Sequence, residues 1–192
     1  DLAVAAGNNS DETLVTRARA KLALGWWQQG FADYERRSGL DRDEGGRRAA
    51  ALWPRLHPGE VAGRRILVTD EQGLGDALQF CRYLPLLADC GAEVVFGVRP
   101  ALARLIGTLD ARIEMRTEVS ETAAFDATIP LMSLPGYFGS TPETVPAAVP
   151  YLQAEPELVA AWGARLGAGG FRIGVAWNAN RHPRADHERS YP

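Results

Sequence analysis

The hydrophobic positions divide the chain into an N-terminal helical pattern and a longer stretch in which short apolar runs alternate with helical ones. Within residues 11–37, apolar side chains recur at intervals of about four, which predicts helices with one buried face. The positions concerned are Leu14, Ala18, Leu22, Trp26 and Trp27. Glycines at 25 and 30 interrupt the pattern, and we expect the turn between two helices to lie near Gly30.

From Arg65 onward the pattern is that of an α/β protein. Short runs rich in β-branched residues predict strands at 66–69, 93–98, 113–115, 126–129 and 172–177. The helical stretches between them predict helices at 75–89, 100–106 and 156–166, with Gly167 ending the last. Strands that alternate with helices predict a Rossmann-like, mainly parallel sheet.

These patterns predict three parts. Residues 1–50 form a helical part with a linker, residues 60–170 form the Rossmann-like unit, and residues 171–192 open a second unit that the chain does not complete. At 192 residues the chain has room for one compact α/β domain and a small appendage. Six prolines between 130 and 156 predict a long surface connection.

Composition and charge exclude several functional classes. The chain is 46% hydrophobic with a net charge of −3, so it is expected to bury a core and not to attract nucleic acid. No apolar run reaches the roughly 18 residues of a membrane span, and because the first residues lack the pattern of a signal peptide, none is expected. Cys81 and Cys90 lack metal-ligand spacing, which favours a reducing compartment. We therefore expect a cytoplasmic protein. We also expect the chain to be a fragment, because it begins with Asp1 and not with an initiator methionine.

The loop after the first predicted strand, residues 70–76, lies where ligands bind in parallel α/β sheets. Gly73 and Gly75 allow a tight turn, and the following helix offers unpaired N–H groups. The loop is not a dinucleotide fingerprint, because Leu78 replaces the third glycine and Arg99 follows the second strand where an acidic residue is needed. It is not a P-loop either, because no Gly-Lys-Ser/Thr follows.

Asp76 opens the helix that follows this loop. A carboxylate there suits a general base that takes a proton from an attacking hydroxyl. It also suits a helix cap, because helix N-termini favour acidic residues. Spacing alone leaves both roles open. Gln79 and Tyr83 follow at three and seven residues, so we expect them on the same helix face as Asp76.

Residues 71–85, EQGLGDALQFCRYLP, resemble the signature of bacterial tetratricopeptide proteins that end in a heptosyltransferase-like glycosyltransferase domain. Residues 22–37 resemble one tetratricopeptide unit, which needs neighbours to bury its face. Further matches follow in order at Trp53, Asp126, 130–135, 150–152, 174–177, Arg189 and Ser190. Together they span roughly residues 22–192, which makes the resemblance fairly specific.

The resemblance implies a GT-B architecture, with the acceptor on a first lobe and a nucleotide-sugar donor on a second. Asp76 then corresponds to the proposed base, and no metal or other cofactor is implied. The substrate-binding residues implied are Glu71, Gln72, Gly73, Gly75, Gln79 and Tyr83. The donor-phosphate residues implied are Asn178, Asn180, Arg189 and Ser190, with Arg181 and Arg184 nearby. The acceptor would be a sugar, lipid or protein, and the fragment alone would be inactive.

Two alternatives stay open. The chain could be a non-catalytic module whose tetratricopeptide-like helices bind a protein partner beside a degenerate glycosyltransferase-like lobe. An NADP-dependent enzyme using Arg99 for the 2′-phosphate is disfavoured by Leu78. Other chemistry-bearing residues have ordinary structural interpretations: His182, Asp186 and His187 in a solvated loop, Trp26, Trp27, Trp53 and Cys81 in the core, and Ser133 at a turn.

Overall fold

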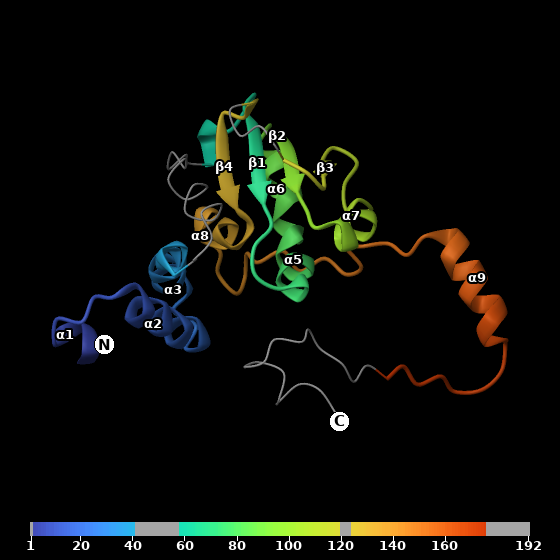
Figure 1. Ribbon diagram of the computed structural model, residues 1–192, viewed down its shortest axis with the longest axis horizontal. Helices are drawn as coiled ribbons and strands as arrows, with labels where there is room; N and C mark the ends of the chain where they lie inside the picture. Colours follow the sequence, from blue (N-terminus) through green and yellow to red (C-terminus); the bar gives the residue numbers. More distant parts are fainter. Residues whose placement is uncertain (1, 41–57, 120–123, 176–192) are drawn as a thin grey trace. The chain divides into compact units, whose positions relative to one another are not determined.

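The computed structural model (Figure 1) describes residues 2–40, 58–119 and 124–175. It divides into two compact units, residues 1–154 and residues 155–192, which are described separately. The first unit contains a helical hairpin and a parallel sheet with its helices, and the described part of the second, residues 155–175, contains one helix. The predicted α/β class with a parallel sheet is confirmed.

The sheet has four parallel strands in the order β3-β2-β1-β4, and the arrows of β1, β2 and β4 lie side by side in Figure 1. Its strands are β1 (Arg65–Thr69), β2 (Glu93–Gly97), β3 (Glu114–Arg116) and β4 (Ala127–Pro130). Val68 pairs with Phe96 on one side and with Ile129 on the other, and all three belong to the core. Leu67 and Val95, on the opposite face, are also fully buried. Burial on both faces explains why these strands read as continuous apolar runs.

The helix expected over 75–89 is interrupted, and the single-helix prediction is wrong there. The segment forms α5 (Leu74–Phe80), a 3-10 turn η3 (Cys81–Tyr83) and α6 (Leu84–Asp89). Pro85 is the physical reason, because it has no N–H to bond the Cys81 carbonyl and its ring would clash with that group. Helix α7 (Pro100–Ile106), by contrast, has the predicted bounds.

The N-terminal elements form an antiparallel helical hairpin. They are α1 (Leu2–Ala5), α2 (Asp11–Ala23), α3 (Trp27–Tyr34) and the 3-10 turn η1 (Glu35–Gly39). The turn between α2 and α3 lies at Gly25, which has a φ of 81°, and the prediction of a turn near Gly30 is wrong. Gly30 lies inside α3 and is buried, because a glycine lets α3 approach Leu22 of α2 closely. Trp26, expected in the core, is 51% exposed.

The proline-rich segment after β4 is only partly a surface connection. Residues 131–135 are buried, forming the 3-10 turn η5 (Leu131–Ser133) and the start of α8 (Leu134–Tyr137). The surface prediction is wrong for these residues, because Leu131 and Leu134 join the core beneath the sheet and outweigh the turn-forming effect of the prolines. A further 3-10 turn, η2 (Pro58–Glu60), precedes the sheet.

The second unit contains α9 (Pro156–Leu166). Its bounds match the prediction, and Gly167, with a φ of 71°, ends it. Residues 171–175 have no strand assignment, and the rest of the strand expected over 172–177 lies outside the described residues. Within the described parts of the chain, no helix combines the length and apolar character needed to cross a membrane.

Candidate functional site

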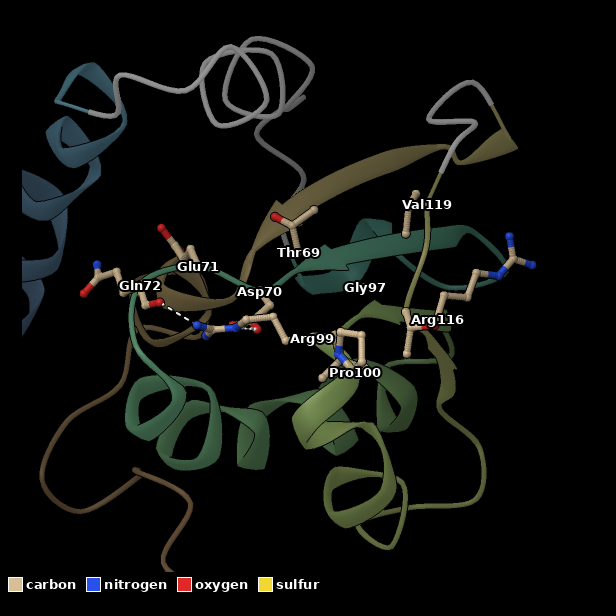
Figure 2. Close-up of a pocket in the computed structure, with 11 residues that line it drawn as sticks. Thr69, Asp70, Glu71, Gln72, Gly97, Arg99, Pro100, Arg116 and Val119 are labelled. Atoms are coloured by element: carbon tan, nitrogen blue, oxygen red, sulfur yellow. Dashed lines mark hydrogen bonds and ion pairs between the residues drawn. The ribbon is translucent and has the colours of Figure 1, made fainter. Parts of the chain in front are cut away.

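An open groove of about 480 Å³ lies at the carboxyl edge of the sheet. Parallel strands end at the same edge, so the residues that follow β1, β2 and β3 gather there. Figure 2 shows Asp70, Glu71 and Gln72 coming from the end of β1, beside Arg99 and Pro100 from the end of β2. Thr69, Gly97 and Arg116 also line the groove.

Two of the residues that line the groove, Asp70 and Arg99, form an ion pair. The Nε and Nη2 atoms of Arg99 donate to the two carboxylate oxygens of Asp70 at 2.6 and 3.0 Å. Asp70 is almost fully buried, with 5% of its side chain exposed, whereas Arg99 is 38% exposed. Arg99 also donates from Nη1 to the carbonyl oxygen of Gln72 at 3.0 Å. Arg99 therefore holds the loop, with part of its guanidinium still open to solvent.

This pair was missed in the sequence, although a signal for it existed. Thr69 pairs with Gly97 across the two strands, so the residues just beyond them project from neighbouring points on one edge. Opposite charges at Asp70 and Arg99 fit such a pairing. The sequence suggested for Arg99 only a contact with the 2′-phosphate of NADP.

The loop turns at Gln72 and not at a glycine. Gln72 has a φ of 61°, whereas Gly73 and Gly75 are not among the residues with positive φ. A left-handed conformation is disfavoured for a residue with a Cβ and persists when its surroundings impose it. Here the Gln72 amide donates to the Tyr34 hydroxyl at 2.7 Å, which ties the loop to α3.

Asp76 acts as a cap in the structure. Its Oδ2 accepts a hydrogen bond from the backbone N–H of Gly73 at 2.9 Å, which satisfies the N-terminus of α5. No other described residue hydrogen-bonds to this carboxylate, so Oδ1 is left to accept a proton or a hydroxyl. Gly75 lies beside it with open space where a side chain would be. Asp76 lies next to the groove residues in sequence but does not line the groove.

The carboxylate of Glu71 is engaged in hydrogen bonds within the protein. Its carboxylate accepts from Nε and Nη2 of Arg37 at 3.0 and 2.7 Å and from the backbone N–H of Met132 at 2.9 Å. Nη2 of Arg37 also donates to Ser133 Oγ at 2.7 Å, and Ser133 Oγ donates to Glu35 at 2.9 Å. Burial alone would lower the pKa of the Arg37 guanidinium, but hydrogen bonding and charge from Glu71 hold that pKa above its usual value. Glu71 is thus part of a packed polar network.

The structure separates Gln79 from Tyr83. Gln79 is exposed, whereas Tyr83 is buried between Phe80 and Phe138 and donates from its hydroxyl to Ser140 at 3.0 Å. Burial raises the pKa of Tyr83. Tyr83 lies in η3, beyond the end of α5, and is buried, so Asp76, Gln79 and Tyr83 do not form one exposed face.

The remaining candidates are placed as follows. Cys81 is buried, and burial raises the pKa of its thiol to about 11, so it packs and does not act as a nucleophile. No cluster of His, Cys, Asp and Glu side chains suited to a metal ion occurs within the described ranges. The predicted donor-phosphate residues lie outside them: Asn178, Asn180, Arg189 and Ser190.

Comparison with models of protein families, with curated proteins and with solved structures found no match to this chain. Its function is therefore inferred from the chemistry of the loop and the groove.

Proposed function

We propose that the α/β unit is the acceptor-side lobe of a GT-B-type glycosyltransferase that uses a nucleotide-sugar donor, with Asp76 as the general base. The observation that carries this proposal is the carboxylate of Asp76. It lies at the start of α5, held by one oxygen to the Gly73 N–H, with its other oxygen not hydrogen-bonded by any described residue. This is a preorganised position for a group that must accept a proton.

The sheet supports the proposal. The strand order β3-β2-β1-β4 matches the first four strands of Rossmann-type folds. In such folds the loop after β1 contacts the ligand, and here that loop carries the resemblance to the heptosyltransferase-like signature. The groove beside the loop leaves room for an acceptor at the same edge.

In the proposed reaction an acceptor hydroxyl oxygen attacks the anomeric carbon of the donor sugar. Asp76 takes the hydroxyl proton as the new carbon–oxygen bond forms. The bond from the anomeric carbon to the nucleoside diphosphate breaks, and its electron pair leaves with the diphosphate. Direct attack inverts the anomeric configuration and needs no metal ion. The donor-phosphate contacts, assigned to Asn178, Asn180, Arg189 and Ser190, remain a prediction.

The test is nucleoside diphosphate release from a panel of nucleotide-sugars by the full-length protein that carries this chain. Asp76→Asn is the sharp variant, because the asparagine oxygen can still accept from Gly73 while the base is removed. We expect turnover to fall by roughly 10² to 10⁴-fold. Asp89→Asn, a change of the same type at an exposed position, is the control and should leave turnover unchanged. Equal turnover by wild type and Asp76→Asn would remove Asp76 from the mechanism.

A second proposal is a protein-interaction role for the hairpin, as one tetratricopeptide-like unit. Leu24, Trp26 and Leu40 are exposed apolar residues on it, and isolated units of that type need a partner surface. If this is the whole function, titration with every nucleotide-sugar gives no heat of binding, and Trp26→Ala removes a protein that otherwise copurifies. Donor binding by the full-length protein would exclude this as the sole role.

A further inference from the structure

The loop that carries Asp76 is held from outside the α/β sheet. Arg37 comes from the end of the helical hairpin and reaches the loop at Glu71, 34 residues away in sequence. Only 9% of its side chain is exposed. Its guanidinium contacts three parts of the chain at once: Glu71 in the loop, Ser133 in η5, and the Tyr34 carbonyl with Glu35 in the hairpin itself.

The charges explain why arginine is needed at this point. Glu71 and Glu35 both bond to the Arg37 guanidinium, and Ser133 links the arginine to Glu35 again. The planar guanidinium can bond both oxygens of Glu71 together with its other partners, which a lysine ammonium cannot do in this geometry. Without this cation, the carboxylates of Glu35 and Glu71 would both lose the positive charge that pairs with them at this point.

The contacts between the hairpin and the loop also position Asp76, through the backbone of residues 71–73. Glu71 is followed by Gln72, whose left-handed conformation is supported by its bond to Tyr34, also a hairpin residue. Gly73 comes next, and its N–H holds the Asp76 carboxylate. Two side-chain contacts from the hairpin therefore fix the backbone that orients the proposed base.

We propose that Arg37 is a positioning residue for the loop 71–76, so that the helical hairpin is a working part of the site and not a detachable module. That Arg37 orders this loop follows from the described contacts alone. The effect on turnover rests on the function proposed above.

Hydrogen exchange tests the loop-ordering part without any substrate. In the full-length protein, Arg37→Gln is expected to raise exchange in the peptide covering residues 70–76 by about tenfold or more, while β1 and β2 amides are unchanged. Arg37→Lys keeps the positive charge but cannot bond both oxygens of Glu71 as the guanidinium does. It provides a second variant if Arg37→Gln does not fold. Unchanged exchange in the loop, or an equal rise in β1 and β2, would overturn the proposal.

Arg17→Gln is the matched control. Arg17 also makes a bidentate pair, with Asp33 at 2.7 Å for both bonds, but that pair lies within the hairpin and does not touch the loop. It should loosen α2 and α3 and leave loop exchange near the wild-type value. Loop exchange that rises as much in Arg17→Gln as in Arg37→Lys would show general loosening of the hairpin and overturn the proposal.

A mutant cycle tests the effect on turnover. Arg37→Lys is expected to lower kcat on the order of tenfold to a hundredfold, with the donor KM little changed, because it misplaces an acceptor-side group. In the Asp76→Asn background the same change should have no further effect, because Arg37 acts through that carboxylate. Additive losses would overturn the proposal. Absence of transfer by the wild type would instead refute the proposed function, and the exchange result would still decide the role of Arg37.

Discussion

Gly30 offers a quantitative test of how the hairpin packs. It lies in the middle of α3, where helix propensity favours alanine over glycine by about 0.8–1.0 kcal/mol. A Cβ at this position would lie 2.7 Å from Leu22 Cγ, 2.8 Å from Leu22 Cδ2 and 3.1 Å from the Leu22 backbone nitrogen. Two opposing effects therefore act on Gly30→Ala, and their sizes decide the sign.

The steric effect is expected to dominate. The obstructing atoms include the branch point of Leu22 and a backbone nitrogen, so relief requires α2 to shift and not only a side-chain tip. Overpacking of this kind costs about 1–3 kcal/mol. After the propensity gain is subtracted, Gly30→Ala should lower the free energy of unfolding by up to about 2 kcal/mol, or the melting temperature by up to about 8 °C.

Urea denaturation followed by circular dichroism measures this change. Gly75→Ala is the control, because a Cβ there meets nothing within 4 Å, and it should be neutral or slightly stabilising. In a Leu22→Ala background, Gly30→Ala should become neutral or stabilising, since the obstructing atoms are gone. If Gly30→Ala stabilises the wild-type protein as much as Gly75→Ala does, the close approach of α2 and α3 is refuted.

Three further outcomes can be measured. Asp76→Ala should lower the free energy of unfolding by about 1 kcal/mol through loss of the Gly73 cap, whereas Asp76→Asn should lower it by much less; equal losses in urea denaturation would contradict the cap. Burial raises the pKa of Cys81 to about 11, so mass spectrometry should find Cys81 unmodified by iodoacetamide at neutral pH until the protein is unfolded. A hydrogen bond from Arg17 lowers the pKa of Asp33, so its stabilisation is present at neutral pH and is lost as the pH falls below about 4. Asp33→Asn should therefore lower the urea midpoint at neutral pH and have little effect at acidic pH, and an equal effect at both would exclude the charged pair.

The strands and several helices could be predicted from the sequence because their signals are local. Apolar runs located β1 and β2 within a residue, and Pro100 and Pro156 marked the starts of α7 and α9. A proline at the first helical position leaves no hydrogen bond unmade, so this signal holds in any tertiary context.

The turn positions were harder to predict, because glycine has two uses. Gly25 adopts positive φ and makes the turn, whereas Gly30 provides space between helices. Both appear as interruptions of an apolar pattern. In the loop, Gln72 adopts the left-handed conformation beside a glycine that does not, because long-range bonds to Tyr34 and Arg99 impose it.

The candidate site was predicted in its location and only partly in its members. The position of residues 70–76 follows from the rule that ligands bind beyond parallel strands. The roles of Glu71 and Tyr83 depend on Arg37 and Ser140, 34 and 57 residues away respectively. No local pattern encodes such distant partners. The sequence alone therefore cannot distinguish the Glu71 carboxylate, which lies in the packed network, from the Asp76 carboxylate, which does not.

The buried network around Arg37 also has a consequence for cotranslational folding. Arg37 leaves the ribosome before its partner Ser133, which follows 96 residues later, a delay of roughly 5–20 s at 5–20 residues per second. During that interval β1 also lacks β4, which pairs along its edge, and an unpaired edge invites association with other chains. The loop 71–76 can therefore reach its final form only near the end of synthesis of this unit. Slowing translation between residues 71 and 133 should lengthen exposure to aggregation and leave the folded product unchanged.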